Sequence, residues 1–143
     1  MNWGQLALVA AALFAGAAFY VSAVEHPARQ KLSPEDALAQ WKPAYQRGAN
    51  MQASLALVGF LLGLVAWWVS GGWLWALGAI VLVANWPYTV FAIMPTNRRL
   101  KSIDPAVAGV ESRALLDVWA RLHMVRTALG ITATLIFLAA SLR

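Results

Sequence analysis

Residues 85–100 read NWPYTVFAIMPTNRRL, a stretch that begins in an apolar run and ends in a cluster of cations. Asn85, Pro87 and Tyr88 therefore place an amide, a helix-breaking ring and a phenol within a segment apolar enough to cross a membrane. Polar groups are costly in hydrocarbon, so they usually face a protein interior or a cavity. The stretch indicates a membrane protein with a polar site at one end of its bundle.

The composition supports this interpretation and excludes several classes of protein. The chain has 143 residues, of which 61% are hydrophobic and 12% charged, whereas soluble domains average about 25% charged. The length allows one compact bundle, so we predict a single domain over residues 1–143. The sequence has no cysteine, which excludes disulfides, thiol catalysis and thiolate metal sites.

Four apolar runs are each near the ~20 residues that a membrane-spanning helix needs. They cover about residues 3–24, 51–70, 73–94 and 122–142. We therefore predict an all-α integral membrane protein, an antiparallel bundle of four transmembrane helices with a tight hairpin at Ser70-Gly71-Gly72. A cleaved signal peptide is the alternative for the first run, but no cation precedes the run and it exceeds a usual signal core.

The charges predict an orientation. The net charge is +5, and ten of the eleven Lys and Arg residues lie in or beside the two long connections, which favours loop charge over nucleic-acid binding. The positive-inside rule makes these connections cytoplasmic and both termini exterior, and we expect a bacterial inner membrane. Trp67, Trp68, Trp73 and Trp75 flank the hairpin and fit an aromatic belt at the outer interface.

The two long connections contain helix-start signals. Residues 33–36 read SPED, a capping serine followed by proline and two acids, which predicts a short helix to about Trp41. Pro43 is expected to start the long second helix. Asp104-Pro105 is a similar signal, and the chain is predicted to be helical from about Glu111 into the fourth span.

The predicted cytoplasmic helix ends hold most of the reactive side chains. Trp119, His123, Arg126 and Gly130 follow the i, i+4, i+7, i+11 pattern, so they share one helix face. If that face points inward, it lines a pocket just inside the membrane. Arg126 is then either a clamp for an anion or carbonyl, or a residue whose cation snorkels to the headgroups.

His26 and His123 are the only histidines, and the topology places both on the same membrane side. Glu25, Asn97 or Tyr88 would have to complete a metal or haem site, since most such sites need three or more protein ligands. Acid–base or hydrogen-bonding chemistry and a structural role remain open for both histidines, and Tyr88 also fits a simple interfacial aromatic.

Pro87 lacks an amide hydrogen, so it is expected to kink the third helix and free the carbonyl of Val83. Asn85 is then expected to support the kink by satisfying such a carbonyl, with substrate contact as the alternative. The small residues of the first helix and the Gly59-x-x-x-Gly63 motif are interpreted as helix packing, with a homo-oligomer seam as the alternative.

The string at 85–100, followed by Trp119 and LHMVRTALG at 122–130, resembles the anthrone oxygenase-like family of small four-helix membrane proteins. That family shows P-Y-T…P-x-N…L closing the third helix and W…L-H-x-x-R opening the fourth. The resemblance implies oxidation of an anthrone to an anthraquinone by molecular oxygen, an activity assigned to some fungal members without a conventional cofactor. It places these residues in family positions: Tyr88, Pro95, Asn97, Trp119, His123 and Arg126.

Together these observations predict a membrane oxidoreductase for lipophilic aromatic or quinone-like compounds. His123 or His26 would remove an acidic C–H proton, and Arg126, Asn97 or Tyr88 would stabilise the enolate oxygen. The alternative is an accessory or binding subunit that ligates haem or a metal through His26 and His123. Transport is disfavoured, because the outer half of the spans is nearly devoid of polar residues.

Overall fold

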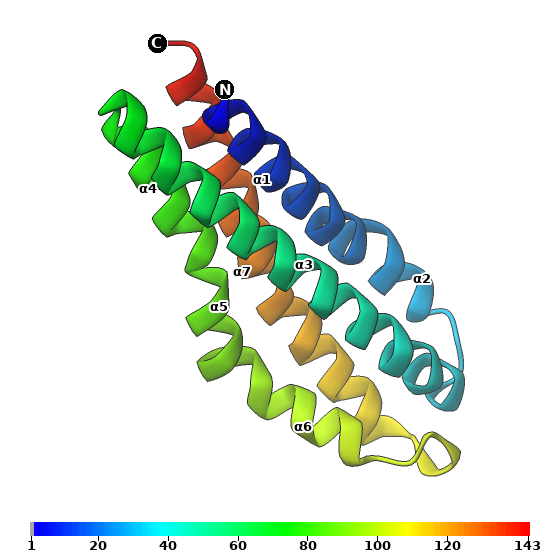
Figure 1. Cartoon of the computed structure of the whole chain (residues 1–143). Helices are drawn as coiled ribbons and strands as arrows, with labels where there is room; N and C mark the ends of the chain where they lie inside the picture. The colour runs from blue at the N-terminus through cyan, green and yellow to red at the C-terminus, as the bar shows by residue number, and fades with distance from the viewer. Residues whose placement is uncertain (1) are drawn as a thin grey trace.

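The computed structural model describes residues 2–143 as four long helical segments (Figure 1). The first segment joins α1 (Trp3–Tyr20), the π-helical turn η1 (Val21–Glu25) and α2 (His26–Arg29), and the second is α3 (Pro34–Ser70). The third joins α4 (Trp73–Val83), α5 (Asn85–Tyr88), the π-helical turn η2 (Thr89–Ile93) and α6 (Met94–Ser102). The 3₁₀ turn η3 (Pro105–Val107) then leads to α7 (Val110–Ser141).

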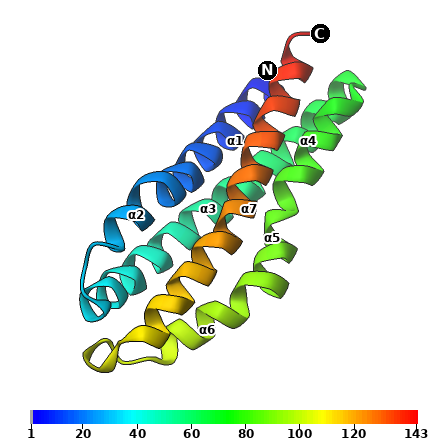
Figure 2. The same cartoon turned by 180° about the vertical axis from the view of Figure 1, so that it is seen from behind.

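The segments form an antiparallel bundle. Helix α1 packs against α3 and α7, and α4 packs against the same two helices. Both termini lie at one end and both long connections at the other (Figures 1 and 2). All four segments are long and apolar enough to cross a membrane. The predicted fold is confirmed, and the chain is an integral membrane protein whose apolar outer faces contact lipid.

The core at the termini end is built from glycines facing large side chains. Gly63 packs against Phe137, and Gly59 packs against Leu82. The GxxxG motif therefore mediates helix packing within the chain. The prediction of an aromatic belt is wrong for Trp75. This residue is only 9% exposed, and its ring packs near that of Phe137. The other three tryptophans of the predicted belt are at least 42% exposed.

Helix α3 begins as predicted but does not break where predicted. The Asp36 amide donates to Ser33 Oγ at 3.1 Å, which confirms the cap. The prediction that Pro43 starts a new helix is wrong, because one helix runs through it. The Pro43 ring lies on the exposed face of α3. Water can therefore donate to the carbonyl of Ala39, which receives no hydrogen bond from the proline. Trp41, on the opposite face, is fully buried and holds the helix in the core.

The third segment is interrupted at Ala84, close to the predicted kink. Pro87 has no N–H to donate to the Val83 carbonyl, and the Asn85 side chain donates to the Leu82 carbonyl at 3.0 Å. Asn85 therefore supports the break in the helix, as predicted, but it binds the carbonyl of Leu82 rather than that of Val83. Helix α4 packs along α3, but α5 and α6 diverge from α3 below the break (Figure 1).

The second connection also differs from prediction in one detail. Asp104 accepts a hydrogen bond from the Ala106 amide, but the Asp104-Pro105 signal produces only the turn η3. The long helix α7 begins at Val110, next to the predicted start. It carries the Trp119 face into the bundle.

Candidate functional site

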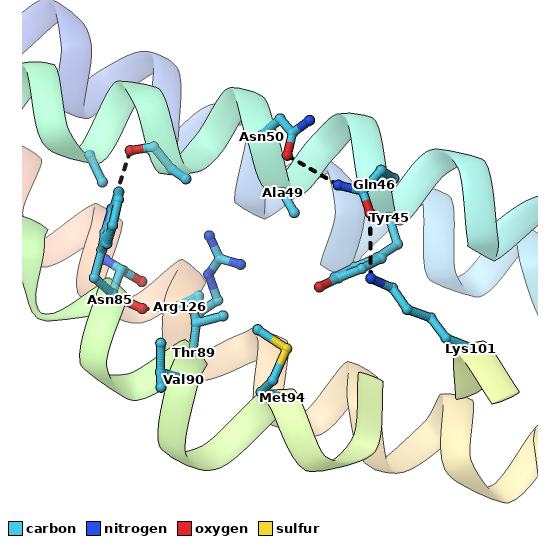
Figure 3. A pocket seen from close by; sticks show the side chains of 13 residues that line it. Tyr45, Gln46, Ala49, Asn50, Asn85, Thr89, Val90, Met94, Lys101 and Arg126 are labelled. Carbon is cyan, nitrogen blue, oxygen red and sulfur yellow. Dashed lines mark hydrogen bonds between the residues drawn. The ribbon is translucent and has the colours of Figure 1, made fainter. Parts of the chain in front are cut away.

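A cavity of about 320 Å³ opens where α5 and α6 diverge from α3 (Figure 3). This volume lies at the lower end of the ~300–1,000 Å³ range of ligand pockets. Its wall comes from α3, from the α5–η2–α6 segment and, through one residue, from α7. The lining residues are Tyr45, Gln46, Ala49, Asn50, Ala53, Ala56, Asn85, Trp86, Thr89, Val90, Met94, Lys101 and Arg126.

Arg126 is the most unusual of these residues. Its side chain points into the cavity in Figure 3, yet the residue is only 7% exposed. The Nε atom is buried without a hydrogen-bond partner, and among residues 2–143 no carboxylate forms an ion pair with the guanidinium. The ring of Phe14 lies 5.7 Å from the guanidinium carbon. A buried, unpaired cation is expensive in a membrane protein, so a ligand atom is expected there.

The rest of the wall is largely apolar, with polar groups at defined points. Asn85 Oδ1 is a buried acceptor without a partner. The Tyr45 hydroxyl accepts a hydrogen bond of 2.9 Å from Asn97 Nδ2, and Asn97 is fully buried behind it. Asn97 therefore acts on the cavity through Tyr45. Trp86 and Val90 are half exposed at the cavity rim, which leaves the cavity open sideways.

A second, much smaller cavity of about 20 Å³ also has Arg126 in its wall. It shares Tyr45, Ala49 and Arg126 with the large cavity, and His123 and Trp119 lie in its wall. A space of ~10–15 Å³ by this measure is enough for one water molecule. The small cavity therefore separates His123 from the large cavity by about one water.

His123 is held in a defined orientation. Its ring stacks on Trp119 with centroids 5.0 Å apart, and Nδ1 lies 3.2 Å from Ser22 Oγ. Ser22 Oγ lies 3.0 Å from Thr127 Oγ1, which donates to the His123 carbonyl. Ser22 thus lies between the His123 ring and Thr127 and fixes which edge of the ring, the one with Nδ1, faces η1.

The three proposed metal ligands have separate protein partners. His26 Nε2 lies 3.6 Å from Asp117, and Glu25 pairs with Arg29. His123 contacts Ser22 instead. Among residues 2–143, no three His, Asp or Glu side chains come together as a set that could hold a metal ion.

The structure thus separates the predicted site residues. The Trp119 face, whose orientation the sequence left open, points inward and is buried, with Arg126 on the large cavity and His123 on the small one. Tyr88 lies elsewhere: its hydroxyl donates to the Leu122 carbonyl at 3.1 Å and ties α5 to α7. His26 also lies outside both cavities.

Sequence reasoning missed Gln46, Thr89 and Lys101 as lining residues. A signal for the α3 wall was present, because Tyr45, Ala49, Ala53 and Ala56 follow the i, i+4, i+8, i+11 pattern of one helix face. No comparable pattern indicates Lys101, which reaches the cavity only because α6 runs across its end (Figure 3).

The fold and site define a class: a four-helix integral membrane protein with a buried, unpaired cation facing a lateral cavity. Comparison with protein families gives the particular assignment. The family model for anthrone oxygenase matches residues 41–136, and the chain belongs to this family. Both family elements, at 85–100 and 119–130, lie within the match, so the resemblance is confirmed. No curated protein and no solved structure matches the chain.

Proposed function

We propose that this protein is an oxidoreductase that uses molecular oxygen to oxidise a flat, lipophilic aromatic ketone of the anthrone type in the large cavity. The observation that carries the proposal is the buried guanidinium of Arg126, which lacks a protein partner and faces an apolar space. A neutral carbonyl that becomes an enolate is a fitting partner, because its negative charge grows during the reaction. Membership of the anthrone oxygenase family supports this choice of substrate.

The chemistry balances without a further reactant. Loss of one proton from the CH₂ carbon opposite the anthrone carbonyl gives an enolate, whose oxygen accepts hydrogen bonds from Arg126. The carbon then gives its electrons to O₂ and forms a C–O bond, and protonation gives a hydroperoxide. Loss of water from the hydroperoxide, with the remaining C–H proton, leaves a second carbonyl. One anthrone and one O₂ thus yield one anthraquinone and one water.

His123 is the proposed proton acceptor. It does not line the large cavity, so the proton would pass through one water in the small cavity between the two. In this proposal Nδ1–H donates to Ser22 Oγ, which leaves Nε2 as the accepting nitrogen. The proton would then be taken up at the small cavity while the guanidinium holds the enolate oxygen in the large one, which keeps the two charges apart.

The route of entry follows from the position of the cavity. Its lateral rim contains exposed Trp86 and Val90, so a lipophilic substrate would enter from the bilayer rather than from water. The membrane is proposed to be a bacterial inner membrane with both termini outside, because the cations gather at the connections. The site would then lie in the cytoplasmic half.

The test is turnover by the purified chain in lipid nanodiscs with anthrone and dissolved oxygen. We expect faster anthraquinone formation than in protein-free nanodiscs, with one O₂ consumed per quinone. Ala53→Phe, which fills the cavity, should abolish the acceleration, while Ala12→Phe on the exposed face of α1 should keep it. The proposal is wrong if the wild-type chain gives no acceleration, or if both variants behave alike.

A further inference from the structure

The charge of the large cavity is unbalanced. Its thirteen lining residues include two cations, Arg126 and Lys101, and no Asp or Glu. Among residues 2–143, neither cation forms an ion pair. In the proposed reaction, the enolate oxygen is the partner of the Arg126 guanidinium but not of Lys101. Lys101 therefore leaves a second positive charge at the cavity without an assigned partner.

Lys101 is an exposed residue whose ammonium group lies at one end of the cavity (Figure 3). It lies 4.8 Å from the centroid of the Tyr45 ring and donates to Gln46 Oε1 at 3.4 Å. The backbone below it is fixed, because Lys42 donates to the carbonyls of Lys101 and Ile103. A neutral amide at this distance is a much weaker partner than a carboxylate, so the ammonium retains most of its capacity to bind an anion.

Three other cations at the same end of the bundle have protein partners. Buried Arg29 pairs with Glu25, and Arg99 pairs with Glu111 at 3.0 Å. Arg113 donates to two backbone carbonyls in the first connection. Exposed Arg47 and Arg98 form no ion pair among residues 2–143, so the feature that distinguishes Lys101 is its place in the wall of a cavity without an acidic residue.

The two cations lie at different points along the cavity. Lys101 contacts Tyr45 and Gln46, at the connection end of the α3 wall, and Arg126 points in from α7 (Figure 3). The two cations thus enter the cavity from different helices, α6 and α7. One ligand with two separate polar groups would contact both.

We propose that the ligand of this cavity is an aromatic acid, with a carboxylate or ionised phenol that Lys101 binds while its ketone oxygen lies on Arg126. The inference rests on the proposed function and specifies its substrate class. Lys101 is a specificity-determining residue: it selects the acid and fixes which end of the flat molecule enters first. The apolar wall between the cations, with Ala49 and Met94, contacts the rings.

The test measures equilibrium binding under anaerobic conditions, so that it does not depend on turnover. The probes are an anthrone with a ring carboxylate and the neutral carboxamide of the same shape. The chain is held in nanodiscs of zwitterionic phosphatidylcholine. The variants are Lys101→Gln, the conservative Lys101→Arg, and Lys31→Gln, which removes an exposed cation outside the cavity.

We expect the wild-type chain and Lys31→Gln to bind the carboxylate roughly tenfold more tightly than the carboxamide, as one charge-assisted hydrogen bond allows. Lys101→Gln should remove this preference without changing carboxamide binding, and Lys101→Arg should restore it. Equal binding of both probes by the wild-type chain overturns the inference but leaves the proposed function standing. Binding of neither probe overturns both.

A lipid phosphate is the other source of an acidic oxygen at this depth. The same measurements in nanodiscs with added anionic lipid distinguish it. If the preference for the carboxylate persists there, Lys101 binds the ligand in the presence of competing headgroups. If anionic lipid removes the preference and the carboxamide still binds, the partner of Lys101 is the headgroup and the inference is wrong.

Discussion

Replacing Arg126 by methionine should affect catalysis and stability in opposite directions. Methionine matches the arginine side chain as far as the position of Nε and removes the charge and all the donors. Removing one donor from an oxyanion site costs about 10²–10³ in turnover, or about 2.7–4 kcal/mol of transition-state stabilisation. The guanidinium is 7% exposed and its Nε has no partner, so we expect at least a hundredfold loss of anthrone oxidation.

The stability of the variant should not fall. In most buried ion pairs, removing one partner leaves an uncompensated charge and destabilises the fold by about 3–5 kcal/mol. Arg126 has no carboxylate partner among residues 2–143, so Arg126→Met leaves no such charge behind. It removes a desolvated cation and keeps an apolar side chain at this position, at the loss of the contact between the guanidinium and the Phe14 ring. We therefore expect a melting temperature equal to or above that of the wild-type chain.

Both quantities can be measured on the same nanodisc preparation, turnover from quinone absorbance and unfolding from tryptophan fluorescence during heating. Arg121→Met is the matched control, because it removes an exposed cation from the same helix. If Arg126→Met retains turnover within threefold, the guanidinium does not stabilise the reacting oxygen. If it melts well below both wild type and Arg121→Met, Arg126 has a structural role that the unpaired geometry does not reveal.

Three further outcomes are expected. His123→Gln should lower turnover by about 10²–10⁴ and remove the pH dependence attributable to the histidine, whereas an unchanged pH profile would exclude it as the base. Gly130→Val should destabilise the bundle by about 1–3 kcal/mol, because the new Cβ would lie 2.7 Å from the Phe14 ring of α1. Gly16→Ala is the control, since the space around Gly16 is open. Equal melting temperatures of the two variants would contradict this packing. The orientation in the membrane can be tested by cysteine labelling, because the chain has no cysteine of its own. The exposed variant Leu142→Cys should react with an impermeant maleimide in intact spheroplasts, and Val107→Cys only after permeabilisation. The reverse pattern would show that the proposed orientation is wrong.

The sequence predicts the bundle because its signals are local. Four apolar runs specify four spans, and the Ser33 cap specifies where α3 begins. The inward face of α7 is equally local, since the spacing of Trp119, His123 and Arg126 leaves them on one side of a helix. These predictions need only the period of a helix and the thickness of a bilayer.

The parts that could not be predicted depend on how helices meet. His26 and His123 lie at the same end of the bundle, as expected. Packing nevertheless places His26 beside Asp117 and His123 beside Ser22. Lys101 looked like ordinary loop charge, and only the divergence of α6 from α3 makes it a cavity residue. Pro43 carries a helix-start signal, but the burial of neighbouring residues outweighs the loss of one exposed hydrogen bond.

Two prolines explain why the cavities adjoin Arg126. Pro27 and Pro95 each follow a residue whose amide donates five residues back: His26 to Val21, and Met94 to Thr89. A proline cannot donate and its ring crowds the carbonyl four residues before it, so a wider π-helical turn accommodates it.

Each of these turns contributes to the wall of a cavity that Arg126 also lines. Val21 of η1 lines the small cavity, Thr89 and Val90 of η2 line the large one, and Arg126 lines both. A regular α-helix at either position would place different side chains against α7 and change the shape of that cavity. The P-x-N element of the third helix therefore has a physical reason beyond its polar side chains: Pro95 shapes the wall that faces the buried cation, and Asn97 holds the Tyr45 hydroxyl beside it.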